Sequence, residues 1–306
     1  MIIEKLDHLT LIKITGDDAA SFLQGQLTND IELASKQWQF SGYCTPKGRL
    51  LALFTVWRTD EGIFALLDKS LVENTLKRLR MYVMRSNVII EEIESHHYAV
   101  LQPSQKELVT NEFLKEEITN LSNYDFAIQP DTHCLCFDNR LLVITQKPVN
   151  TDTSNQGKQQ QWLREDIKTG LPQVNEHSVE LFIPQMLNLD ILNGINFKKG
   201  CYTGQEIVAR MHYLGKLKQR MFVCTLHSNK NDQTPNENIR VGDKIYKDSS
   251  MQSTAGNIVS VNHNIALAVL RLDSVEEANQ GNHFFNINED TTLQVNENQP
   301  YSLDIK

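Results

Sequence analysis

One cysteine of this chain lies in a setting that favours thiol chemistry. Cys201 follows two lysines, Lys198 and Lys199, and glycines stand close to it on both sides. Thr203 and Glu206 have the spacing of a capping box, which predicts a short helix that begins near residue 204. A helix N-terminus and neighbouring ammonium groups both stabilise a thiolate. The sequence therefore predicts that Cys201 is a reactive thiol.

The remaining cysteines give a different pattern. Cys134 and Cys136 lie in the apolar stretch HCLCF, which favours buried structural thiols. Cys44 is the rival for reactivity, because Lys47 and Arg49 follow it in a predicted turn. The chain has five cysteines at uneven spacing, which is not typical of a secreted disulfide framework. We therefore expect free thiols.

Strands and helices in mixed order must position these residues. Residues 6–16 are rich in β-formers and predict a strand, and residues 17–30 predict a helix. Two further strands are predicted at 38–43 and 49–57, on either side of a turn with a proline and a glycine. Apolar residues then repeat at helical spacing over 70–83 and leave a basic outer face.

The pattern changes near residue 215. Short β-rich pieces separated by Gly, Asn and Asp follow it, which predicts a small all-β barrel. We therefore expect an α+β body over residues 1–210 and a C-terminal β-barrel domain over residues 215–306. A chain of 306 residues is about twice as long as a typical domain, which agrees with this division.

Composition and charge restrict the class of protein. With 40% hydrophobic and 22% charged residues, wholesale disorder is excluded, and the apolar runs are too short to span a bilayer. The N-terminus lacks the basic and long apolar regions of an export signal, so we expect a cytoplasmic protein. The net charge of −8 repels nucleic acid. Residues 198–220 have the opposite net charge, because they contain six basic residues and one glutamate.

The segment around Cys201 closely resembles a family signature. FKKGCYTGQEIVAR is similar to the motif of the YgfZ-type folate-binding, tRNA-modifying proteins, whose mitochondrial relatives are iron–sulfur assembly factors. The core of that motif is present from Lys199 to Glu206 without a substitution. Four other stretches also resemble blocks of the family: GDDAASFLQGQLTND, YCTPKGRLLA, QQWLREDIKTGLP and FIPQMLNLDILNGINFKKG.

The resemblance implies a fold and a folate site. The family shares the fold of the T-protein of glycine cleavage, with an α+β body of interleaved subdomains and a C-terminal β-barrel around a tetrahydrofolate site. It implies that Trp162 is an aromatic wall for folate, and the alternative is a core tryptophan. Leu9 stands where the family has a second tryptophan. The implied cofactor contacts are Trp162, Lys198, Lys199, Tyr202, Gln205, Glu206 and Arg210.

Three functions follow from the resemblance and the residues. The first is a tetrahydrofolate-binding accessory protein that supports tRNA thiolation through the assembly or maintenance of iron–sulfur enzymes. Cys201 would be a transient cluster ligand or sulfur carrier, with the other ligands from partner proteins or small thiols. The second is a tetrahydrofolate-dependent aminomethyltransferase, whose activating acid is expected in residues 86–100, where the carboxylates are Glu91, Glu92 and Glu94. The third is a direct tRNA-binding module built on residues 198–220. No membrane partner is expected.

Overall fold

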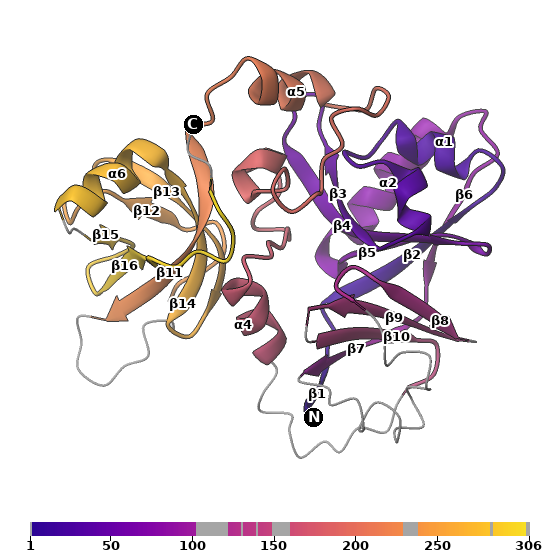
Figure 1. Cartoon of the computed structure of the whole chain (residues 1–306), viewed down its shortest axis with the longest axis horizontal. Coiled ribbons are helices and arrows are strands. Elements are labelled where there is room, and N and C mark those ends of the chain that lie inside the picture. The colour runs from indigo at the N-terminus through magenta and orange to yellow at the C-terminus, as the bar shows by residue number, and fades with distance from the viewer. Residues whose placement is uncertain are drawn as a thin grey trace. The chain divides into compact units, whose positions relative to one another are not determined.

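The computed structural model describes residues 2–101, 122–129, 131–138, 140–148, 160–228, 238–281 and 284–303. The chain forms two compact units, and each is assembled from separate stretches of sequence (Figure 1). Unit 1 comprises Met1–Tyr43, Ala52–Trp162 and Asn193–Tyr202. Unit 2 comprises Cys44–Leu51, Leu163–Leu192 and Thr203–Lys306. The segment that carries Cys201 therefore ends unit 1 just before unit 2 resumes.

The first sheet of unit 1 is antiparallel, with strand order β1-β7-β10-β9-β8. Its strands are β1 (Ile2–Lys5), β7 (His96–Leu101), β8 (Phe126–Gln129), β9 (Thr132–Phe137) and β10 (Arg140–Thr145). Cys134 and Cys136 are two residues apart on β9, so their side chains share one face of the sheet. Both pack in a buried cluster with Tyr98 and Val143. The prediction of buried structural thiols is confirmed.

The second sheet of unit 1 has the order β3-β4-β5-β2-β6. Its strands are β2 (Leu9–Thr15), β3 (Gln39–Cys44), β4 (Leu50–Thr59), β5 (Gly62–Asp68) and β6 (Ile89–Ile93). Two buried indoles connect the sheets of unit 1, since Trp38 Nε1 donates to the Cys136 carbonyl and Trp57 Nε1 donates to His133 Nδ1, both at 2.8 Å. The strands predicted over 6–16, 38–43 and 49–57 are confirmed.

Short helices complete unit 1. They are α1 (Ala19–Gln24), α2 (Val72–Val83) and the 3-10 turns η1 (Ile31–Ser35) and η2 (Lys69–Leu71). Helix α2 buries Leu76 and Leu79, which are three residues apart, and leaves Lys77 and Arg80 exposed. The predicted helix with a basic outer face is therefore confirmed, because one apolar stripe is enough to hold an amphipathic helix on a domain.

Unit 2 is built on a closed barrel with strand order β11-β14-β13-β12-β15-β16. Its strands are β11 (Gln219–Ser228), β12 (Lys244–Tyr246), β13 (Thr254–Asn262), β14 (Ile265–Arg271), β15 (Phe285–Asn286) and β16 (Thr291–Val295). The predicted α+β fold with a C-terminal β-barrel is confirmed. Gly256 lets β13 approach β14, because a Cβ there would lie 1.9 Å from the Val269 carbonyl oxygen.

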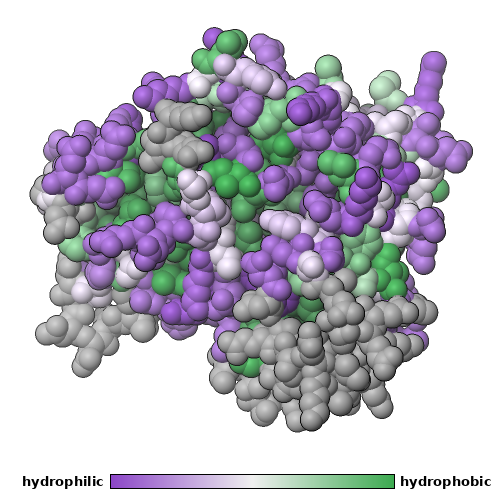
Figure 2. Space-filling view, viewed as in Figure 1, coloured by the Kyte–Doolittle hydropathy of each residue, from purple (hydrophilic) through white to green (hydrophobic). Residues whose placement is uncertain are grey.

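Unit 2 also contains helical segments outside its barrel strands. They are α4 (Gln161–Lys168, which starts at the end of unit 1), η5 (Pro184–Leu187), α5 (Gln205–Tyr213) and α6 (Leu272–Gly281). Figure 2 shows a face of the molecule on which hydrophilic side chains predominate and hydrophobic ones appear between them. The helix that follows the cysteine motif, α5, is the element that matters most for the site.

Candidate functional site: the Cys201 loop and helix α5

The loop that carries Cys201, residues Asn193–Tyr202, is held to unit 1 by the side chain of Lys199. Lys199 Nζ donates hydrogen bonds to the carbonyl oxygens of Leu27 and Asn29, both at 2.7 Å. The same ammonium lies 5.3 Å from the centroid of the Tyr202 ring, a cation–π distance. Lys199 therefore connects the cysteine loop to the loop that follows α1.

Three more hydrogen bonds join the same two loops. Thr28 Oγ1 donates to the Gly194 carbonyl at 2.7 Å, and the Asn196 N–H donates to the Thr28 carbonyl at 3.0 Å. Asn29 Nδ2 donates to the Asn193 carbonyl at 2.6 Å. Because donors and acceptors on both loops are satisfied by each other, the loop has a fixed path up to Cys201.

The two lysines of the motif play different parts. Burial lowers the pKa of the Lys199 ammonium to about 8, and the negative charge of Asp30 partly opposes that shift. Lys198 is exposed. Both lysines were predicted to act as cations beside the thiol, whereas Lys199 is an anchor whose donors are directed at backbone carbonyls. The reason is tertiary, since only the fold brings residues 27–29 to this loop.

Cys201 is the exposed cysteine of the five. Burial raises the pKa of Cys44 and of Cys134 to about 12, and it also raises the pKa of Cys224. The pKa of Cys136 is raised to about 11, mainly by burial and to a smaller extent by the negative charges of nearby aspartates. Beside Cys201, a Cβ built on Gly200 would meet nothing within 4 Å. A reagent can therefore reach the Cys201 thiol, whereas the other four are inert by burial.

Helix α5 begins against the turn Cys44–Leu51, in unit 2. The turn closes with a hydrogen bond from the Gly48 N–H to the Thr45 carbonyl at 2.9 Å. A Cβ on Gly204 would lie 2.5 Å from the Thr45 carbonyl oxygen and 3.1 Å from the Gly48 Cα. The two glycines therefore allow backbone contact between two family-like blocks that are far apart in sequence. Cys44 is covered at this contact.

The start of α5 differs from the predicted capping box. The N-cap is Gly204, with φ of 84°, and no side chain caps the helix. Thr203 is therefore not the cap, and Glu206 lies one position nearer to the helix start than a capping box requires. The close contact with the Thr45 carbonyl explains the difference, because only glycine fits there at positive φ. Glu206 still lies in the first turn, where a carboxylate is favourable.

Trp162 is a core residue of unit 1. Its side chain is 4% exposed, and its ring meets the Phe137 ring edge-on at 5.3 Å. The guanidinium of Arg140 lies 4.2 Å from the centroid of the indole. The Trp162 N–H also donates to Glu4 Oε2 at 3.0 Å. Trp162 therefore packs in the protein core, which was the alternative to its predicted role as an aromatic contact for folate.

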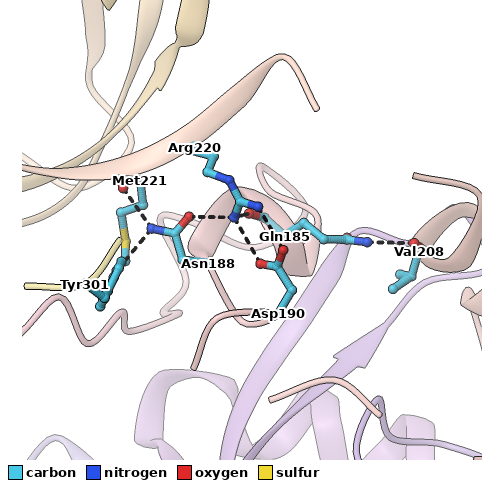
Figure 3. A network of polar contacts seen from close by, with 7 residues as sticks. All are labelled: Gln185, Asn188, Asp190, Val208, Arg220, Met221 and Tyr301. Atoms are coloured by element: carbon cyan, nitrogen blue, oxygen red, sulfur yellow. Dashed lines mark hydrogen bonds and ion pairs between the residues drawn. The ribbon is translucent and has the colours of Figure 1, made fainter. Parts of the chain in front are cut away.

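A polar network in unit 2 fixes the chain where β11 begins (Figure 3). Arg220 makes a two-pronged ion pair with Asp190, with N–O distances of 3.0 and 2.9 Å. Asn188 donates to the Met221 carbonyl at 2.8 Å and to the Tyr301 hydroxyl at 3.0 Å. These side chains are largely buried, so the ion pair is shielded from solvent.

This network lowers the number of uncompensated positive charges in residues 198–220. Arg220, one of the six basic residues of this stretch, is paired with Asp190, which neutralises its charge. On the same network, Gln185 Nε2 donates to the Val208 carbonyl of α5 at 2.6 Å, which ties the helix to η5. Asp190, Asn188 and Gln185 were not predicted as important, because no local pattern distinguishes them in the sequence. The exposed cations that remain are Lys198, Arg210, Lys216 and Lys218.

Among the described residues, no group of three or more His, Cys, Asp or Glu side chains is placed to hold a metal ion. Cys201 belongs to no such group among the described residues. No helix among them combines the length and the apolar character needed to cross a bilayer.

Comparisons with known proteins agree with these features. No family model matches the chain. The tRNA-modifying protein YgfZ of Yersinia enterocolitica is 34% identical over 230 residues, which cover 71% of this chain and 68% of that protein. YgfZ of Hamiltonella defensa is 33% identical over 235 residues, with 72% and 68% covered. The chain belongs to the YgfZ family. The resemblance of its cysteine motif to that family is confirmed.

The fold extends beyond the family. The crystal structure of the glycine cleavage system aminomethyltransferase T from Bartonella henselae superposes with a TM-score of 0.68 and covers 96% of this chain and 84% of that one. Sequence identity is 13%, so this likeness concerns the fold alone. The T-protein-like architecture predicted for this YgfZ family member is confirmed.

Proposed function

We propose that this protein is a cytoplasmic accessory protein of tRNA modification that acts through Cys201. The observation that carries the proposal is the contrast among its cysteines, since Cys201 is exposed on an anchored loop and the other four are buried. Its YgfZ relatives are named as tRNA-modifying proteins, which supports the same process here. The finer proposal is tRNA thiolation, supported through the assembly or maintenance of iron–sulfur enzymes.

The chemistry available at the loop is that of one accessible thiol. An iron–sulfur cluster is usually held by four ligands, and Cys201 supplies one. The others would come from a partner protein or from small thiols, so a cluster here is cargo in transfer. The anchored loop serves this role because it holds one sulfur ligand in place without enclosing it.

Reduced folate, with tetrahydrofolate as the form expected, is the second part of the proposal and is supported by the family resemblance and the fold. Two implied contacts fit it poorly, because Trp162 is covered by Arg140 and Phe137, and Lys199 is bonded to two carbonyls. Tyr202 is buried next to Lys199. Lys198, Gln205, Glu206 and Arg210 stay predicted contacts for the folate or its glutamate tail. No step of the chemistry above depends on the folate.

One experiment tests both parts side by side. Wild type, Cys201→Ala and Lys198→Ala are compared for tRNA thiolation in cells that lack the native gene and for tetrahydrofolate binding to the purified proteins. We expect Cys201→Ala to abolish support of thiolation while its thermal stability and folate affinity stay unchanged. Normal thiolation with Cys201→Ala would refute the assignment to this thiol.

The same purified proteins can be assayed for the alternative activity, tetrahydrofolate-dependent aminomethyl transfer. Turnover of a small aminomethyl donor with tetrahydrofolate would indicate a transferase instead. Two of the candidate acids, Glu91 and Glu92, lie on β6, and Thr10 Oγ1 donates to Glu92 Oε1 at 2.8 Å. Loss of turnover in Glu91→Gln or Glu92→Gln, with thiolation unaffected by Cys201→Ala, would establish that reading.

A further inference from the structure

The C-terminal end of α5 exposes an aromatic and an aliphatic side chain. Tyr213, the last residue of the helix, is 64% exposed, and Leu214 is 85% exposed. The ring of His212 meets the Tyr213 ring edge-on, with centroids 4.7 Å apart. Because Tyr213 and Leu214 are adjacent and both are largely exposed, this end of the helix is a candidate contact surface.

Basic residues flank these side chains in the sequence. Arg210, Lys216 and Lys218 are all exposed, and no Asp or Glu occurs between Ile207 and Gln219. The whole chain has a net charge of −8, so the sign of this segment is opposite to that of the molecule. A polyanion is therefore attracted to this segment and repelled by most of the remaining charge.

The surface has a defined backbone. The N–H groups of Leu214 and Gly215 both donate to the Arg210 carbonyl, at 2.9 and 2.8 Å. Further along, the Leu272 N–H donates to the Lys218 carbonyl at 2.9 Å, and the Arg220 ion pair fixes the start of β11. Both ends of the exposed turn are thus fixed within unit 2, and little conformational entropy is lost when it binds a partner.

We propose that this surface, formed by Arg210, His212, Tyr213, Leu214, Lys216 and Lys218, binds RNA directly, with an unpaired base stacked on Tyr213. The proposal rests on the proposed function, because the RNA is the tRNA whose modification the protein supports. The lysines and the arginine contact phosphates, and the aromatic ring provides the flat face on which any base can stack. Loops and ends of RNA supply such unstacked bases.

An acidic protein segment is the competing occupant, and the composition of this surface favours RNA over it. A second acid-free stretch, residues 74–90 at α2, shows what a different surface looks like. Its exposed apolar side chains are Met81, Met84, Ile89 and Tyr82, so three of the four are not aromatic, and such side chains fit a protein partner better. On the α5 surface the tyrosine is more exposed, 64% for Tyr213 against 44% for Tyr82, and its ring meets the His212 ring beside lysines on a short turn. The α2 stretch therefore provides a matched control for charge.

The test is binding of an unmodified tRNA transcript to the full chain, followed by fluorescence anisotropy at several salt concentrations. We expect Tyr213→Ala to weaken binding about tenfold, from the loss of one stacked base. Lys216→Glu with Lys218→Glu should weaken it at least tenfold and lower the salt dependence by between one and two counterions. The control, Lys77→Glu with Arg85→Glu at α2, makes the same change in net charge and should alter affinity less than threefold.

Three results would overturn the proposal: no binding of the transcript by wild type at low salt, equal losses in the α5 and α2 double variants, or full affinity in Tyr213→Ala. In the first case the acidic protein partner becomes the better assignment. Cys201→Ala separates this proposal from the proposed function. It should bind the transcript with wild-type affinity even though it no longer supports thiolation. Melting temperatures of all variants confirm that each is folded.

Discussion

The Cys201 loop and the Cys44 turn have similar residue types around their cysteines, but one thiol is exposed and the other is buried. Both belong to family-like blocks in which a cysteine lies close to a lysine and a glycine. The loop is anchored by Lys199 from one side, and its thiol is exposed. The turn is covered where Gly204 contacts Thr45 and Gly48, and its thiol is fully buried. A cysteine's reactivity is therefore decided by which element packs over it.

The difference also separates two ways of fixing a segment. The loop depends on hydrogen bonds from one ammonium group and a few polar side chains, which tolerate an open surface above them. The turn depends on direct backbone contact, which requires glycine and leaves no space. The first arrangement suits a functional thiol, and the second suits a structural one. Four predictions test this comparison.

The largest expected difference is in the rates of thiol alkylation. With the pKa of Cys44 raised to about 12 by burial, its thiolate fraction at neutral pH is roughly a thousandfold below that of an ordinary cysteine. We expect iodoacetamide to modify Cys201 at least a thousandfold faster than Cys44, measured site by site by mass spectrometry. Comparable rates at the two cysteines would contradict the structural contrast.

The second effect comes from filling the contact over Cys44. Gly204→Ala places a methyl group 2.5 Å from the Thr45 carbonyl oxygen at positive φ. We expect the free energy of unfolding to fall by about 3 kcal/mol, measured by urea denaturation. Gly200→Ala is the matched control, because its Cβ would meet nothing within 4 Å, and it should change stability by less than about 0.5 kcal/mol. Equal losses in both variants would argue against the contact.

The third effect concerns the anchor of the Cys201 loop. Lys199→Met removes the donors to the Leu27 and Asn29 carbonyls. We expect a loss of about 1.5 kcal/mol in stability and faster hydrogen exchange of the amides from residue 194 to 200. Lys198→Met, at an exposed position, serves as the control and should leave both measurements unchanged. A stable, protected loop in Lys199→Met would show that the other hydrogen bonds suffice.

The smallest effect is the pH dependence of that anchor. The pKa of Lys199 is lowered to about 8 in the folded chain, so between pH 8 and its ordinary value the unfolded state binds more protons. Stability due to this group therefore rises as pH increases through that range. Because Lys199 is partly solvated, we expect a gain of only about 1 kcal/mol from pH 8 to 9.5, relative to Lys199→Met. A flat difference across this range would show that burial costs the ammonium little.

Much of the fold could be predicted, because local patterns encode it. Runs of β-forming apolar residues predict the strands β2 and β4, and the apolar stripe of α2 places its basic residues outward. The change of pattern near residue 215 gives the barrel, whose first strand begins at Gln219. The interleaving of two units along the chain has no such local signal, since it depends on contacts between distant stretches.

The candidate site divides in the same way. The sequence alone determined the family and the choice of Cys201, because an uninterrupted motif and the polarity around a cysteine are local properties. Only the tertiary structure decided the partners of each charged residue: Lys199 meets the carbonyls of Leu27 and Asn29, and Arg220 meets Asp190. Charge–carbonyl and charge–charge contacts depend on distance in space, and the order of residues along the chain does not record that distance.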